Sequence, residues 1–220
     1  MTRELTYQHA MRDLVNLYAE IDHLTMECCA AWLPKAPDRH AQLEMAEQIG
    51  EERNHYLSQV EWLNCHAGGH ASIVLPSWAD SLRTLVNGMQ WPEYLACVHL
   101  AIEGVGIALV ERVARDADQG VKDCLAPSLR DEGGHASFGV RQLEQLLQSV
   151  DGKKREELKR RIIASVTAIA RLASSLPVTS AHWEAVGTST EELRDIAAQR
   201  LGTLLSPLGI SQSVNLSASA

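Results

Sequence analysis

Two glutamate–histidine pairs with the same spacing are the residues of this sequence best suited to chemistry. Glu52 precedes His55 by three residues, and Glu132 precedes His135 by three residues. Side chains at positions i and i+3 share one face of an α-helix, so each pair can direct a carboxylate and an imidazole toward one point. Carboxylate oxygen and imidazole nitrogen are both ligands of divalent transition metals. The two pairs therefore predict a metal site.

The heights of these residues along their helices support the prediction. Residue 36, between Pro34 and Pro37, lies midway between Glu20 and Glu52. Two antiparallel helices that leave a turn together reach equal height after equal numbers of residues, here about 16 on each side, or about 24 Å. We therefore expect Glu20 to lie level with Glu52.

A second hairpin repeats this arrangement. The turn at residues 116–120 lies midway between Glu103 and Glu132. The offset from the first hairpin to the second is 83 residues for one pair of glutamates and 80 residues for the other. Each hairpin thus offers one glutamate and one Glu-x-x-His pair, and the sequence predicts a six-ligand set with approximate twofold symmetry.

Helical periodicity dominates the chain, and we find no strand-like alternation long enough to compete with it. Proline and glycine clusters end the periodic segments, and Ser, Thr or Pro stands at several of their starts. The predicted long helices span about 3–33, 38–65, 91–117, 121–148, 153–176 and 188–206, with a short helix at about 77–86. The fold class is therefore predicted to be all-α.

The six-ligand set resembles that of the ferritin-like di-iron carboxylate proteins, in which one Glu from each of two helices joins a Glu-x-x-His pair from each of the other two. The resemblance covers residues 3–148. It implies a ferritin-like four-helix bundle at residues 1–150, with one long crossover formed by the connector His66–Gln90. Residues 151–220 are then additional C-terminal helices packed on the bundle, followed by a flexible tail.

The same resemblance implies a cofactor of two iron ions, Fe2+ or Fe3+, with manganese as an alternative that ligand type does not distinguish. Its catalytic and metal-binding residues would be Glu20, Glu52, His55, Glu103, Glu132 and His135. Metal-bound histidines usually donate their other ring N–H to a carboxylate. Asp131 is expected to hold His55 in this way and Glu51 to hold His135. His23 is assigned as a neighbour of the site, and whether His23 or His99 is an extra ligand stays open.

Glycines gather near the predicted ligands, where each costs a helix interior about 1 kcal/mol relative to alanine. They are Gly104, Gly106, Gly133, Gly134 and Gly139. One interpretation is a cavity that admits dioxygen and a substrate. The other is close contact between helices. Gly106 is the best cavity candidate, because it lies three residues after Glu103.

Composition excludes several other classes of protein. The chain has 220 residues, 45% of them hydrophobic and 22% charged, with a formal net charge of −8. This balance is typical of a folded domain and weighs against general binding to nucleic acid or anionic membranes. No apolar run resembles a secretory leader or a membrane span. Five cysteines without a C-x-x-C pair favour free thiols in a reducing cytoplasm.

The resemblance to the ferritin-like di-iron proteins implies an enzyme, a non-haem di-iron oxygenase or hydroxylase that uses O2 to oxidise a small organic substrate. The C-terminal helices favour this branch over the alternative, a bacterioferritin-like protein of iron oxidation and storage. No cofactor motif for electron transfer occurs, so a ferredoxin or reductase is expected as partner. The basic run 153–161 could receive such a partner, a carrier protein or tRNA, although a solvated helix start explains it more simply. A homodimer is compatible with the sequence, which does not determine the oligomeric state.

Overall fold

The computed structural model describes residues 5–211, and within this range every regular element is a helix. Most bounds agree with the predicted ranges to within a few residues. The elements are α1 Tyr7–Trp32, η1 Leu33–Lys35, α2 Arg39–His66, α3 Pro76–Asn87, α4 Trp91–Leu95, η2 Ala96–Val105, α5 Gly106–Asp116, α6 Gln119–Gln148, α7 Gly152–Ala173, α8 Ser180–Ala185, α9 Thr190–Leu205 and η3 Ser206–Leu208.

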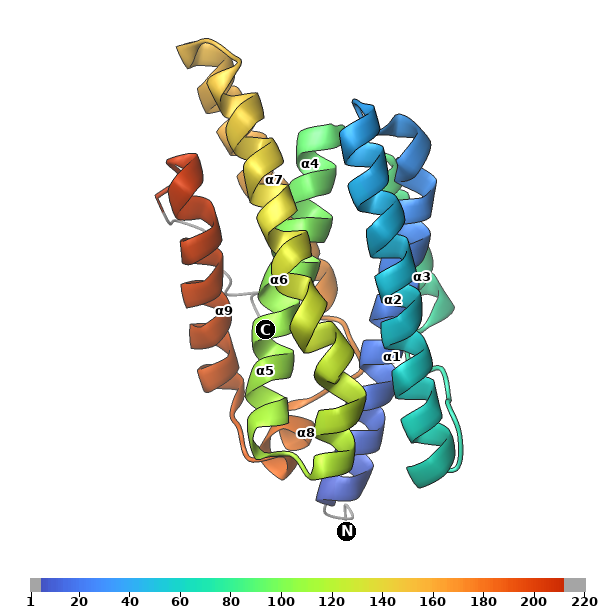
Figure 1. Ribbon diagram of the computed structural model, residues 1–220. Helices are drawn as coiled ribbons and strands as arrows, with labels where there is room; N and C mark the ends of the chain where they lie inside the picture. Colours follow the sequence, from blue (N-terminus) through green and yellow to red (C-terminus); the bar gives the residue numbers. More distant parts are fainter. Residues whose placement is uncertain (1–4, 212–220) are drawn as a thin grey trace.

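Four long rods form the centre of the fold. They are α1, α2, α6 and the continuous helix Trp91–Asp116, which consists of α4, η2 and α5. Helix α1 packs along α2, α2 along α6, and α6 along η2 and α5 (Figure 1). The segment that contains α3 connects the two hairpins along the length of the bundle. The predicted all-α bundle with one long crossover is confirmed.

Side-chain caps explain where the rods begin. Asp38 accepts a hydrogen bond from the backbone of the first turn of α2, Asp118 does so for α6, and Asp151 for α7. Ser189 caps α9 in the same way. Each cap satisfies one of the backbone N–H groups that the first turn of a helix leaves unpaired.

The C-terminal helices share one hydrophobic core with the bundle. Leu158 and Ile162 of α7 and Leu201 and Leu205 of α9 belong to the same buried cluster as residues of α1, α2, η2 and α6. Additional helices packed on the bundle are therefore observed, whereas the boundary at residue 150 stays a prediction. The tail predicted to be flexible, residues 212–220, lies outside the described residues.

The rod Trp91–Asp116 differs from a regular α-helix in its middle. Residues Ala96–Val105 form a π-helix, in which hydrogen bonds run from i to i+5. The sequence predicts one uninterrupted α-helix here, and that prediction is wrong for these residues. This segment is rich in buried apolar side chains, so its pattern contains no amphipathic period that would reveal the change of register.

The same rod is long and apolar enough to cross a membrane by length and composition alone. Its most apolar window has a mean hydropathy of 1.6, and 61% of that window is buried inside the bundle. One such helix is weak evidence for a membrane span, and the burial of this one is that of a core helix. The expectation that no helix spans a membrane stays a prediction.

Two glycines permit close contact between helices. An added Cβ at Gly139 of α6 would lie 2.5 Å from His99 Cβ, and one at Gly104 would lie 2.6 Å from Leu204 Cδ1. Close helix contact is thus the correct interpretation for these two positions. An added Cβ at Gly106, Gly133 or Gly134 meets no atom within 4 Å.

This difference predicts opposite effects of adding one methyl group. Gly139→Ala should lower the free energy of unfolding of the metal-free chain by about 1–3 kcal/mol, because the methyl group overpacks the contact with His99. Gly50→Ala, on an exposed position of α2 with open space around it, should raise it by about 0.5–1 kcal/mol. Chemical denaturation followed by circular dichroism measures both. Equal effects of the two substitutions would contradict the packing argument.

Candidate metal centre

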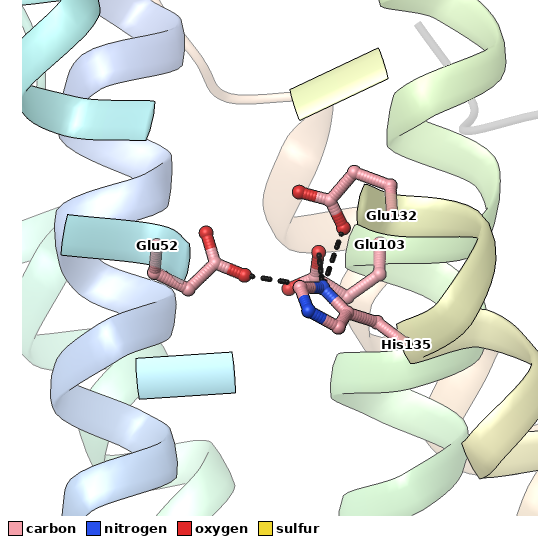
Figure 2. A group of neighbouring side chains, drawn as sticks. All are labelled: Glu52, Glu103, Glu132 and His135. Carbon is pink, nitrogen blue, oxygen red and sulfur yellow. Dashed lines mark hydrogen bonds and ion pairs between the residues drawn. The ribbon is translucent and has the colours of Figure 1, made fainter. Parts of the chain in front are cut away.

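Four side chains from three rods meet inside the bundle. They are Glu52 of α2, Glu103 of η2, and Glu132 and His135 of α6. One ligand atom of each lies within 4.8 Å of the others, and all four residues are buried. Figure 2 shows the carboxylates of Glu52, Glu103 and Glu132 directed toward the ring of His135.

A second group shares Glu52 with the first. Asp22, Glu52 and His55 also offer ligand atoms within 4.8 Å of one another. The Nδ1 atom of His55 lies 3.4 Å from Glu52 Oε2 and 3.3 Å from Glu132 Oε1. Glu52 and Glu132 therefore stand between the two histidines, whose ring centroids are 6.4 Å apart. Two groups joined by carboxylates are what a pair of metal ions needs.

Glu20 lies outside both groups, so the structure does not bring it together with the other five predicted ligands. Its Oε1 lies 2.9 Å from His70 Nε2, and its Oε2 accepts a hydrogen bond from Ser72 Oγ at 3.0 Å. Both contacts tie α1 to the connector after α2, on a partly exposed face. Asp22 occupies the position that the sequence analysis gave to Glu20.

Glu20 and Asp22 differ in the face of the helix that they occupy more than in their height along it. Positions 20 and 22 differ by about 3 Å in height, but residues two apart point to nearly opposite sides of a helix. A signal for Asp22 is present in the sequence, because it lies seven residues after the apolar Val15 and seven before Cys29, both fully buried. Glu20 instead lies seven residues after Asp13 and seven before Glu27, on a polar face.

Gln59 of α2 fixes the carboxylate of Asp22. Its Nε2 donates a hydrogen bond of 2.8 Å to Asp22 Oδ2, and the same nitrogen lies 3.5 Å from Ser128 Oγ of α6. Gln59 is 1% exposed. Nothing in the sequence singles out Gln59, since a lone amide carries no spacing signal.

His23 and His99 do not join the two groups. The ring of His23 lies beside Tyr56, with a centroid distance of 5.3 Å. His99 is fully buried between Tyr94 and Phe138, at centroid distances of 5.5 Å and 5.2 Å. Burial, followed by the nearby charge of His135, lowers the pKa of His99 to about 3, so this ring is a neutral part of the core.

Carboxylates hold the outer nitrogens of both cluster histidines. His55 Nε2 lies 3.3 Å from Asp131 Oδ2, and His135 Nε2 lies 2.7 Å from Glu51 Oε2. These are the contacts expected from the sequence. Each carboxylate fixes the orientation of its imidazole and leaves Nδ1 facing the cluster.

Burial of several carboxylates together changes their acidity. Burial and the nearby charge of Glu103 raise the pKa of Glu52 to about 7. Burial and Glu132 raise the pKa of Glu103 to about 8. Burial, with the charge of Glu52, also raises the pKa of Asp22 well above its ordinary value. The interior therefore disfavours this set of negative charges unless cations accompany them.

Without metal, the two histidines supply the cations. Burial lowers the pKa of both histidines, but the nearby carboxylates outweigh this effect. Glu132 and Glu52 raise the pKa of His55 to about 11, and Glu103 and Glu132 raise the pKa of His135 to about 12. Both imidazoles are therefore protonated at neutral pH in the metal-free chain.

Unpartnered atoms show that the groups suit a metal. Glu52 Oε2, Glu103 Oε1 and His55 Nδ1 are buried and have no hydrogen-bond partner. Buried polar atoms are normally satisfied, and the exceptions mark functional sites. Four carboxylates and two neutral imidazoles would neutralise two divalent ions. Hard oxygen and imidazole donors suit iron or manganese, so the residues fit the implied pair of ions.

A surface cavity leads toward the histidines. It has a volume of about 230 Å³, lies between α2 and α6, and is lined by Glu44, Glu47, Gln48, Glu51, Asp131, Gly134, His135, Phe138 and Arg141. Gln48 and His135 are buried residues that contact Glu52. The cavity therefore connects solvent to the edge of the candidate metal centre.

Substitutions at Asp22 and Glu20 test which of these two residues of α1 binds metal. The structure favours Asp22, whereas the sequence spacing favours Glu20. Asp22→Asn should reduce tightly bound metal from two ions to one per chain, because it weakens the group of Asp22, Glu52 and His55. Glu20→Gln should retain two ions. Anaerobic loading with Fe(II), followed by desalting and elemental analysis, measures both. The reverse result would restore Glu20 as the ligand.

Metal binding should also release protons. A metal ion requires neutral imidazole, whereas His55 and His135 are protonated in the metal-free chain. Since Glu52 and Glu103 also hold protons near pH 7, the affinity for Co(II) should rise from pH 6 to pH 8. Titration in a weakly buffered solution with an indicator dye should detect at least about two protons released per chain. Metal binding without proton release would contradict these ionisation states.

Comparisons with known proteins agree with the fold. No family model and no curated protein sequence matches the chain. Among solved structures, 21 chains match. One is a Synechococcus protein described as having aldehyde deformylating oxidase activity, with a TM-score of 0.76 and 17% sequence identity. The match covers 96% of this chain and 94% of that one, and thus includes the C-terminal helices. The chain therefore has the ferritin-like fold that its sequence pattern implied.

Proposed function

We propose that this protein is a non-haem di-iron oxidoreductase of the oxygenase or hydroxylase type, which uses O2 to oxidise a small organic substrate. The observation that carries the proposal is the pair of ligand groups that share Glu52 inside the bundle. When bound there, two ferrous ions would supply the electrons for reduction of O2, which the side chains themselves cannot supply.

The side chains have distinct roles in this proposal. Asp22, Glu52 and His55 would hold one ion, and Glu52, Glu103, Glu132 and His135 would hold the other. Asp131 and Glu51 keep the two imidazoles oriented with Nδ1 toward the ions. The same contacts keep the ring proton of each histidine on Nε2, which leaves Nδ1 free to bind metal.

The structural likeness favours oxidation of a substrate over storage of iron. It extends over 96% of the chain, so it includes α7 and α9 as well as the four rods. The name of the similar protein makes aldehydes the first substrate class to test. A ferredoxin or reductase is proposed as electron donor, and the protein is proposed to work in the cytoplasm.

The experiment measures O2 consumption and visible absorption of the chain after it has been loaded with Fe(II) in the absence of oxygen. On mixing with O2, the protein with two Fe(II) ions should consume O2 rapidly and show a transient visible absorption. Glu103→Gln should slow O2 consumption at least about a hundredfold, because the loss of a catalytic metal ligand removes transition-state stabilisation. Glu20→Gln is the matched control, because this glutamate lies outside both groups, and it should retain the rate of the unaltered chain.

The amount of iron separates the proposal from the storage function. After aerobic addition of excess Fe(II) and a chelator wash, an oxygenase should retain two ions per chain. Retention of tens of ions per chain, in a particle of many subunits by light scattering, would establish storage instead. A series of aldehydes and other small substrates, with a chemical reductant, then tests for O2-dependent consumption of substrate.

A further inference from the structure

Helix α9 packs directly on the π-helix that carries Glu103. Gly104 follows Glu103, and its missing Cβ lets Leu204 Cδ1 approach to within 2.6 Å of where that atom would stand. Leu201 and Leu205 of the same helix are buried at 1% and 0% exposure. The C-terminal helix is thus in contact with the residue that immediately follows a candidate ligand.

Arg200 of α9 adds a polar contact at the same point. Its Nε donates a hydrogen bond of 2.9 Å to the backbone carbonyl of Gly104. Among residues 5–211, Arg200 forms no ion pair, so this carbonyl is the polar group on which its charge acts. Hydrogen bonds from charged donors are stronger than those between neutral groups.

The backbone at this point needs support from its surroundings. A π-helix is rare, occurs mostly as a single turn inside an α-helix, and is common at functional sites. Here it extends over ten residues, Ala96–Val105. Helix α6 packs against one part of this segment, where Gly139 touches His99 and Leu100. Helix α9 packs against another part, at Gly104.

We propose that α9 is a clamp that maintains the π-helical register of residues 96–105, and that Arg200 is the positioning residue that thereby keeps Glu103 in the metal centre. The effect on metal binding rests on the proposed function. The effect on the backbone does not, because it concerns the metal-free chain.

The register matters because it sets the direction of Glu103. In an α-helix successive residues are rotated by about 100°, so a change of register turns a side chain away from its former direction. Of the candidate ligands, Glu103 is the one that η2 carries. The group of Asp22, Glu52 and His55 comes from α1 and α2, and should not depend on the clamp.

A matched control exists at the opposite end of α9. Arg112 of α5 donates to the carbonyl of Gly187 at 2.7 Å and forms an ion pair with Glu192 in the first turn of α9. It therefore attaches the same helix to the same rod, but at a point outside η2. A purely structural role for Arg200 would make the two arginines equivalent.

Hydrogen exchange of the metal-free protein tests the clamp on the backbone. Arg200→Met keeps a long unbranched chain and removes the donor. It should speed amide exchange in peptides that cover residues 96–106 by about tenfold relative to the unaltered chain. Arg112→Met should speed exchange around residues 187–193 and leave 96–106 unchanged. Arg200→Lys, which restores a charged donor, should recover at least part of the protection.

Co(II) titration, followed by visible absorption, tests the effect on Glu103. The unaltered chain and Arg112→Met should bind two ions. Arg200→Met should bind one ion normally and the second about tenfold to a hundredfold more weakly, the usual effect of losing an outer contact of a metal site. Equal exchange at 96–106 in both variants, or two undisturbed ions in Arg200→Met, would overturn the proposal. An unaltered chain that binds no Co(II) would refute the proposed function, while the exchange result would still decide whether α9 is a clamp.

Discussion

Burial of three carboxylates, with a fourth partly buried beside them, is the constraint on which the rest of the structure depends. Glu52, Glu103 and Glu132 meet in the interior and Asp22 lies next to Glu52, where like charges repel and little water enters. Cations must accompany them, and in the metal-free chain the protonated imidazoles of His55 and His135 provide part of the compensation. A core selected only for stability would contain hydrocarbon here. The cluster is therefore a cost to folding that a bound metal can offset.

The arrangement of the rods confines the free-energy cost of burying these charges to one part of the bundle. The same helices also contribute two hydrophobic clusters, and α7 and α9 insert leucine and isoleucine into the larger of them. Asp131 and Glu51 bring additional negative charge, but each stands toward the surface and pairs with a histidine. The polar network thus has one buried centre and an outer layer near solvent, which limits desolvation to the groups that can bind metal.

The sequence predicted the helices, the crossover and the grouping of carboxylates and histidines from α2, η2 and α6, because these follow from local spacing. Turn positions and the i, i+3 rule determine height and face within one helix. They do not determine how α1 is rotated about its own axis, which depends on the whole set of buried residues along it. The choice between Glu20 and Asp22 is such a question. The apolar face of Val15 and Cys29 answers it, whereas a search for repeated Glu-x-x-His motifs does not.

The π-helix shows a different limit of sequence analysis. Residues 96–105 are apolar and buried on most sides, so no amphipathic pattern records their register. What distinguishes the π-helix from an α-helix lies in its neighbours, since Gly139 and Gly104 let α6 and α9 approach its backbone. These glycines are distant from α9 in sequence, and their meaning appears only when the C-terminal helices are in place. Because Glu103 lies in this segment, the geometry of the centre depends on residues well beyond the four rods that supply its ligands.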